Sequence, residues 1–276
     1  MAITVDPSKF QFDDAFVPKK YEELLVPRLF TPWAKVLLDK LQLRTGQSIL
    51  DIATGPGTVA RLAAEQVGTQ GKVVATDISP HMLAVARSKP SLPAWAPIEF
   101  VESSAAPLKV ANGSADVVVC QQGLQFFTDK PAALKEMRRA LRPGGRVGIA
   151  VWAGVGSCTI WSAYHHALAA AGLTDLAQRM LSPFSWPGQR ELEVAMREAG
   201  IGEVTAETKA MPMIFEGGVD QAFEAYSGQP VGPAIAGLPE LVRERLREAL
   251  AVQFSPMLRN GQIHGQMTSY LAIGSV

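Results

Sequence analysis

A strand followed by a glycine-rich turn is the part of this chain best suited to hold a small ligand. Residues 49–52 form a short apolar run with one acid, Asp51, and Gly55 and Gly57 follow just before a helical pattern begins. Glycine accepts positive φ and lets a ligand approach the backbone closely. The free N–H groups that open the following helix would point into that turn. We therefore expect a ligand site at the carboxyl end of this strand.

Two cofactors compete for this turn. Residues 55–60 fit the loose dinucleotide pattern G-x-G-x-x-A, which would place an anionic pyrophosphate beside Asp51. The carboxylate would repel that group, whereas it would attract the ammonium and sulfonium of S-adenosylmethionine. A plain capped helix with no ligand is the third interpretation, and Asp51 favours S-adenosylmethionine. The turn residues expected to contact it are Ala53, Thr54, Gly55 and Gly57.

The next strand, expected over 72–77, ends in a second acid. Asp77 follows the glycine turn by about twenty residues, where a carboxylate in a parallel α/β sheet accepts both ribose hydroxyls. This role exists for NAD and for S-adenosylmethionine, so Asp77 indicates a nucleoside without choosing between them. As a helix cap Asp77 is less suited than Ser79, which precedes Pro80. The residues expected against the adenine ring are Ile78 and Met82.

Composition narrows the class of protein. The 276 residues are 47% apolar, enough for one large α/β domain with a substantial core. With 26 basic and 26 acidic residues, the net charge of zero argues against a broad basic surface for nucleic acid. Cys120 and Cys158 have no metal-type spacing, so reduced thiols in the cytoplasm are the simple interpretation. We see neither a signal peptide nor a membrane-spanning run.

Four segments, in the right order, resemble the class I S-adenosylmethionine-dependent methyltransferases, most closely the ubiquinone/menaquinone-biosynthesis type. They are the glycine-turn run 50–57, Asp77, the Cys-Gln-Gln-Gly-Leu loop at 120–124, and Met-Arg-Arg-Ala-Leu-Arg-Pro-Gly-Gly at 137–145. The likeness covers residues 48–152. It implies an α/β, Rossmann-like doubly wound sheet of seven strands, mostly parallel, with the last strand antiparallel beside the fifth.

The resemblance also implies a domain organisation. We expect an N-terminal helical cover at 1–45, beginning with an arm to about residue 17, and a cofactor-binding core at 46–152. The remainder of the sheet, with a helical lid at about 172–189 and 216–265, occupies 153–276, all in one compact unit. Tyr21 is a candidate to cover the cofactor, together with Arg28, Phe30 and Trp33; ordinary core packing is the alternative for the last two.

Further site residues follow from the resemblance. After the third strand, family members usually carry an acid for the adenine amino group, and this chain has Ser104 instead, flanked by Ser103 and Ala105. A serine hydroxyl still accepts one hydrogen bond, and the backbone there could carry more of the recognition. The loop after the fourth strand faces the transferable methyl. Its Gln121 is expected at the cofactor, and Gln121, Gln122 and Gln125 could orient the acceptor or merely pack against the methionine moiety.

Methyl transfer from a sulfonium mainly requires alignment of the reactants and exclusion of water, and a base only where the nucleophile must lose a proton. Metal-dependent catechol methylation needs acids near the end of the fourth strand, where this chain has Gln121 and Gln122, so we expect metal-independent transfer to a small molecule. His165 is the candidate base or acceptor ligand, and Gln122 is a second candidate catalytic residue; for His165, a hydrogen-bonded core or lid histidine is the alternative. An aromatic or apolar acceptor would suit the lid, although these side chains equally suit a core: Met180, Phe184, Trp186, Met211, Met213, Phe215, Phe223 and Met257.

Two other functions stay open. Ser104, where an acid is expected, leaves room for a protein that binds S-adenosylmethionine or S-adenosylhomocysteine without transferring a methyl group. The G-x-G-x-x-A match leaves an NAD(P)-dependent oxidoreductase, disfavoured by Asp51. We expect a monomer or homodimer with no nucleic-acid partner.

Overall fold

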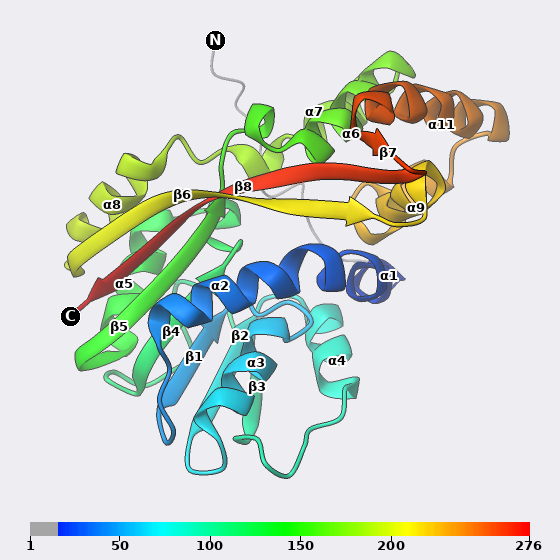
Figure 1. Cartoon of the computed structure of the whole chain (residues 1–276). Coiled ribbons are helices and arrows are strands. Elements are labelled where there is room, and N and C mark those ends of the chain that lie inside the picture. Colours follow the sequence, from blue (N-terminus) through cyan, green and yellow to red (C-terminus); the bar gives the residue numbers. More distant parts are fainter. Residues whose placement is uncertain (1–15) are drawn as a thin grey trace. The chain divides into compact units, whose positions relative to one another are not determined.

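The structure is a computed structural model and describes residues 16–276 (Figure 1). The first part of the expected arm lies outside these residues. Within them the chain forms one eight-stranded sheet in the order β3-β2-β1-β4-β5-β8-β6, with β7 paired to β8. The strands are β1 (Ser48–Ile52), β2 (Lys72–Asp77), β3 (Ile98–Glu102), β4 (Ala115–Gln121), β5 (Leu141–Trp152), β6 (Gly202–Phe215), β7 (Leu258–Arg259) and β8 (Gln262–Ser275).

The described chain divides into two compact units. The sheet unit comprises Phe30–Val151, Gly188–Thr208 and Tyr270–Val276, and the helical unit comprises the residues up to Leu29, Trp152–Pro187 and Lys209–Ser269. The sheet unit holds α2 (Thr31–Leu41), α3 (Thr58–Val67), α4 (Pro80–Ser88), α5 (Lys130–Ala140) and α8 (Gln189–Glu198). The helical unit holds α1 (Phe16–Leu24), α6 (Thr159–Ala170), α7 (Thr174–Arg179), α9 (Gly218–Glu224), α10 (Gly232–Ala236) and α11 (Glu240–Phe254). The division into cover, core and lid stays a prediction.

In the sheet unit, β1 is paired in parallel with β2 on one side and with β4 on the other. The strand order therefore reverses between β1 and β4, and in such sheets ligands bind at the carboxyl ends beside that switch point. β4 is β-branched and almost continuously buried, as expected for a central parallel strand. The parallel register also aligns Asp77 with Glu102, so the ends of β2 and β3 lie side by side.

The last strand runs antiparallel to the fifth, as the resemblance implies. Near the start of β5, the Gly144 N–H donates to the carbonyl of Val276 over 2.6 Å. Just after its end, the Ala153 N–H donates to Thr268 over 2.9 Å. Successive residues along β5 therefore pair with residues of decreasing number along β8, which defines an antiparallel pair. The fold class expected from the sequence is therefore confirmed, with the short β7 added to the seven strands.

One expectation about the fifth strand is wrong. The Arg-Pro-Gly-Gly segment at 142–145 predicts a turn that separates a helix from a strand beginning at Arg146. In the structure β5 begins at Leu141, which pairs with Ala115, and the register shifts before Val117. Gly144 has φ +77°, so its left-handed backbone belongs to the irregular first part of β5 and not to a separate turn.

The helical unit has an aromatic core around α6. The Tyr164 ring lies 4.5 Å from that of Tyr226 and 5.5 Å from that of Phe254, measured between centroids. The Tyr164 hydroxyl donates to the carbonyl of Ala222, and the Tyr226 hydroxyl donates to the carbonyl of Tyr164. Each buried aromatic ring contributes about 2 kcal/mol through burial, and the hydroxyls keep their hydrogen bonds. α6 is thereby fixed against α9 and α11.

Candidate functional site

The turn between β1 and α3 has the conformation that the glycines predict. Gly55 has φ +55°, and a Cβ atom built there would meet nothing within 4 Å. Gly57 has φ +83°, and its Cβ would lie 3.1 Å from that of Ala86, so this glycine packs the turn against α4. Ala53 has φ +56°, a conformation that costs energy for a residue with a side chain. The turn is therefore closed on one side and open at Gly55.

Asp51 is buried directly beneath this turn. Its Oδ2 accepts the Thr54 hydroxyl at 2.5 Å. Burial raises the pKa of the Asp51 carboxyl from 3.8 to about 7; the Thr54 hydroxyl and the Ala60 N–H oppose this rise, and the charge of Asp77 adds to it. A cationic ligand at the turn would favour the ionised form. An ionised Asp51 would attract a cation at this turn and repel an anion, and its contact with a cofactor stays a prediction.

Asp77 closes the other side of the turn. Its Oδ2 accepts the Gly55 N–H at 2.7 Å and its Oδ1 accepts the Ser79 N–H at 2.9 Å. Burial raises the pKa of this carboxyl too. Each oxygen retains acceptor capacity for a hydroxyl, so the ribose role remains available to Asp77. The bond to Gly55 is a second role, in which Asp77 holds the glycine turn, and no local pattern in the sequence indicates it.

Ile78 and Met82 have different surroundings. The Ile78 side chain is 73% exposed, which is unusual for isoleucine and leaves an apolar surface directly after Asp77. Met82 is buried in the first turn of α4, where its N–H donates to Ser79 Oγ. Ser79 is therefore the helix cap, as expected, and Ile78 is the residue that offers a free surface to a flat ring.

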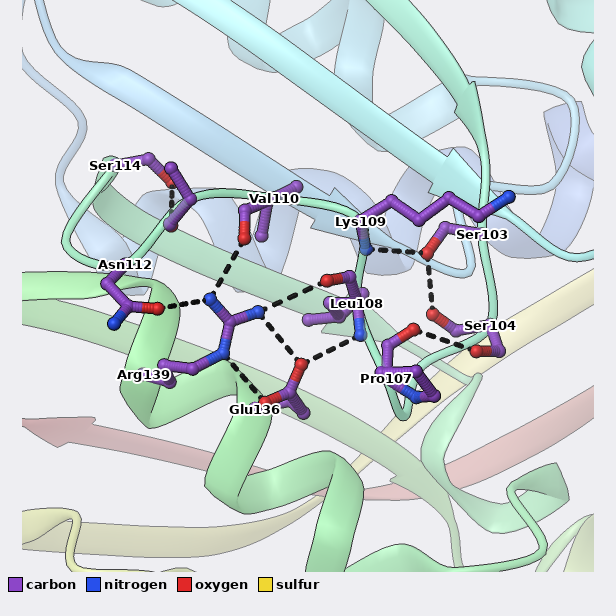
Figure 2. A network of polar contacts seen from close by, with 11 residues as sticks. Ser103, Ser104, Pro107, Leu108, Lys109, Val110, Asn112, Ser114, Glu136 and Arg139 are labelled. Carbon is purple, nitrogen blue, oxygen red and sulfur yellow. Dashed lines mark hydrogen bonds and ion pairs between the residues drawn. The ribbon is translucent and has the colours of Figure 1, made fainter.

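The loop after β3 contains Ser103, Ser104 and Ala105 (Figure 2). The Ser103 N–H donates to the carbonyl of Asp77 at 3.0 Å, so this loop lies beside the expected ribose contact. Ser103 Oγ donates to the Ser104 carbonyl, and Ser104 Oγ donates to the carbonyl of Pro107 at 2.8 Å. The Ser104 hydroxyl therefore donates its hydrogen within the loop, and its oxygen can still accept a hydrogen bond from an amino group.

The segment after β4 lies against the glycine turn, since a Cβ atom built on Gly123 would come within 2.7 Å of that of Ala53. Gln121 Nε2 donates to the carbonyl of Phe30, while its buried Oε1 has no hydrogen-bond partner among residues 16–276. Gln122 has φ +55°, and its N–H donates to Ala150. Gln125 is fully buried, and within the described part of the chain neither its Nε2 nor its Oε1 has a hydrogen-bond partner.

Tyr21 and His165 belong to the helical unit, as do Arg28 and the side chains expected in the lid. Tyr21 is half-buried on α1. His165 is half-buried on α6, and its Nδ1 lies 2.9 Å from the carbonyl oxygen of Ala177. Since a carbonyl only accepts, Nδ1 carries the hydrogen and Nε2 is left as a proton acceptor. His165 therefore joins α6 to α7 through Nδ1.

Among residues 16–276, His, Cys, Asp and Glu side chains form no group of three or more that could hold a metal ion. No helix in this part of the chain is long and apolar enough to cross a membrane.

Two solved structures with a similar architecture are methyltransferases whose descriptions name S-adenosylmethionine. Phosphoethanolamine N-methyltransferase 2 of Haemonchus contortus, in complex with S-adenosyl-L-methionine, superposes with a TM-score of 0.59 at 17% identity, over 95% of this chain and 57% of that one. An enzyme from Aquifex aeolicus gives 0.52 at 20% identity, over 71% and 93%. At these identities the likeness shows a shared fold, the Rossmann-like fold of class I methyltransferases.

Sequence comparison then identifies the family. The family model of the ubiE/COQ5 methyltransferases matches residues 19–215, so this chain belongs to the ubiE/COQ5 methyltransferase family. The ubiquinone/menaquinone biosynthesis C-methyltransferase UbiE of Hahella chejuensis is 39% identical over 135 residues, covering 48% of this chain and 54% of the relative. Demethylmenaquinone methyltransferase of Lactococcus lactis is 39% identical over 115 residues, covering 42% and 46%. The chain matches only about half the length of these curated relatives.

Proposed function

We propose that this chain transfers a methyl group from S-adenosylmethionine to a small-molecule acceptor, without a metal ion. The observation that carries the proposal is the pair of buried carboxylates at the ends of β1 and β2, where Asp51 accepts the Thr54 hydroxyl and Asp77 accepts the Gly55 N–H of the same turn. A cationic nucleoside cofactor satisfies both acids, whereas a pyrophosphate would meet Asp51 as a like charge. The oxidoreductase alternative is disfavoured for this reason and by membership of the family.

The residues of the sheet unit fit the cofactor. Asp77 has acceptor capacity for ribose hydroxyls, Ile78 exposes an apolar surface, and Ser104 Oγ can accept an amino hydrogen. The open space at Gly55 and the Asp51–Thr54 pair suit the methionine end. S-adenosylmethionine would supply a methyl group already activated on a sulfonium. The remaining contributors proposed from the same edge are Ala53, Gly57, Met82, Ser103, Ala105 and Gln121, with Tyr21 from the helical unit.

For the acceptor we propose an aromatic, quinol-type molecule methylated on carbon. The names of the UbiE relatives support this class. Aromatic and thioether side chains of the helical unit support it as well: the Trp161 and Phe184 rings lie 6.3 Å apart, and Met180 is buried. Gln125 could orient the acceptor, because neither the NH2 group nor the oxygen of its buried amide has a partner among residues 16–276.

Carbon methylation of a quinol replaces a ring hydrogen by the methyl group and releases one proton, so a base is useful. His165 is our candidate base, because the bond from Nδ1 to Ala177 leaves Nε2 able to accept a proton. Gln122 is proposed to assist in orienting the acceptor. His165→Gln should lower kcat about a hundredfold if Nε2 accepts that proton. An unchanged kcat would remove His165 from the mechanism.

Calorimetry and a transfer assay test the proposal. The wild-type protein should bind S-adenosylmethionine and S-adenosylhomocysteine but not NAD, and binding of NAD alone would overturn the proposal. The transfer assay offers a radiolabelled methyl donor with a demethylmenaquinol that has a short prenyl tail and, separately, with a panel of phenols and amines. We expect transfer to the demethylmenaquinol. Cofactor binding with no transfer to any of them would favour a binding protein instead. A cytoplasmic location and a monomeric or homodimeric state belong to the same proposal.

A further inference from the structure

Arg139 on α5 is bonded to the loop between β3 and β4 more extensively than any local pattern indicates (Figure 2). Its Nη1 donates to the Val110 carbonyl at 2.9 Å and to Asn112 Oδ1 at 2.5 Å, and its Nη2 donates to the Leu108 carbonyl at 3.2 Å. The Arg139 carbonyl in turn accepts the Gly113 N–H. One side chain thus fixes three points of a loop that has no regular structure.

Glu136, one turn earlier on α5, completes the arrangement. It accepts the Leu108 N–H at 2.7 Å and two bonds from the Arg139 guanidinium, at 2.7 and 2.8 Å. The hydrogen bond from Arg139 holds the pKa of the Glu136 carboxyl below its usual range. The N–H and carbonyl of Leu108 are therefore both held from α5. A planar guanidinium with five donors suits this task, and an ammonium does not.

The held part of the loop is connected to the ligand site by two further bonds. The Lys109 N–H, next to Leu108, donates to Ser103 Oγ at 3.0 Å, and Ser103 Oγ donates to the Ser104 carbonyl at 2.8 Å. The Ser103 N–H is bound to the carbonyl of Asp77. A continuous series of contacts thus runs from Arg139 to the segment beside the ribose carboxylate.

We propose that Arg139 and Glu136 are positioning residues that hold residues 103–110 in the shape that recognises adenine. This inference rests on the proposed function, since it requires a nucleoside cofactor. An acid side chain recognises an amino group without help from its loop, whereas Ser104 and backbone carbonyls must be placed in advance. By fixing the loop, Arg139 therefore compensates for the missing acidic side chain at Ser104.

The test compares S-adenosylhomocysteine with S-inosylhomocysteine, which carries a keto oxygen in place of the adenine amino group. Calorimetry on the wild-type protein should show a clear preference for the adenine compound. In Arg139→Met the adenine compound should bind about tenfold more weakly, because charge-assisted hydrogen bonds that place the loop are lost. The inosine compound should lose much less, so the preference should fall. Arg139→Lys should restore only part of it.

Arg142→Met is the matched control. Arg142 also binds a carboxylate, Asp116 at 2.7 Å, and carbonyls of the same loop, but at Gly113 and Ser114, away from the ligand site. This variant should keep both affinities within about twofold of wild type. Equal losses for both compounds in Arg139→Met, or an unchanged preference, would overturn the inference.

Glu136→Gln, a smaller change in the same contacts, keeps the test valid if Arg139→Met does not fold. Hydrogen exchange at the Leu108 and Lys109 amides should accelerate in this variant, and the adenine preference should fall in step. Unchanged exchange and preference would contradict the inference. A wild-type protein that binds neither compound would overturn the proposed function itself, whereas binding with normal preference in every variant would overturn only the positioning role.

Discussion

The two units of this chain use polar groups in different ways. At the carboxyl edge of the sheet unit, each acid already makes bonds to the turn it is expected to serve: Asp51 to Thr54, and Asp77 to Gly55. In the helical unit, the tyrosine hydroxyls are used within an aromatic core, and His165 links two helices. The polar groups of the sheet unit thus fix the backbone of the glycine turn, whereas those of the helical unit complete the packing of large side chains. We propose that the first arrangement serves the cofactor and the second the acceptor. Single substitutions should separate these two kinds of specificity.

The largest expected effect is that of Asp77→Ala on cofactor binding. The change removes the proposed ribose acceptor and also the partner of the Gly55 N–H. We expect the Kd for S-adenosylhomocysteine to rise by at least about a hundredfold, since charged hydrogen-bond partners are lost at two places. Calorimetry measures it. The control, Glu224→Gln, removes an exposed ion pair with Lys20 in the helical unit and should leave the Kd unchanged. Retained affinity in Asp77→Ala would contradict the ribose role.

Sequence and structure agree best where the signal is local. A strand, a glycine turn and an acid at a strand end lie within a few residues of one another, so Asp51, Gly55 and Gly57 could be placed from their types alone. The bonds from Asp77 to Gly55 and from Arg139 to the loop at 108–112 join segments far apart in the chain. No periodicity encodes such contacts. The early start of β5 has the same origin, because its pairing with β4 decides it.

Asp51 provides a test through the pH dependence of stability. In the folded protein its pKa is about 7, against 3.8 for an unburied carboxyl. As pH rises from 4 to 7, the unfolded chain releases this proton and the folded chain retains it, so the stabilising contribution of the protonated group, complete at low pH, is lost. Relative to Asp51→Asn, wild type should lose up to about 4 kcal/mol of unfolding free energy over this range. Urea denaturation at several pH values measures it.

The affinity for the cofactor should increase with pH through Asp51, whereas the stability of the free protein decreases. Because a cation prefers the ionised carboxylate, wild-type affinity for S-adenosylmethionine should increase with pH up to about 7 and then level off. Asp51→Asn should bind weakly at every pH and show no such rise. If both proteins have the same pH profile, Asp51 does not interact with the charge of the cofactor.

Gln125→Met tests whether the acceptor side extends into the sheet unit. The wild-type amide is fully buried, and neither of its polar atoms has a partner among the described residues, so an apolar side chain of similar length should stabilise the free protein by about 1 kcal/mol. We expect Tm to rise by about 2 °C. The KM for a demethylmenaquinol should increase about tenfold while the Kd for S-adenosylhomocysteine stays constant. Gln66→Met, on the exposed surface of α3, should change none of these values.

The smallest effect tests whether the helical unit is stabilised mainly by the packing of its large aromatic rings. Tyr226→Phe keeps the ring against Tyr164 and removes only the hydroxyl, which donates to the Tyr164 carbonyl at 3.1 Å. The loss of one buried hydrogen bond should cost about 1 kcal/mol and lower Tm by about 2 °C. Tyr226→Ala also removes the ring and should cost about 4 kcal/mol. If the two variants lost equal stability, the hydroxyl network rather than ring packing would hold α6 in place, and the contrast between the units would disappear.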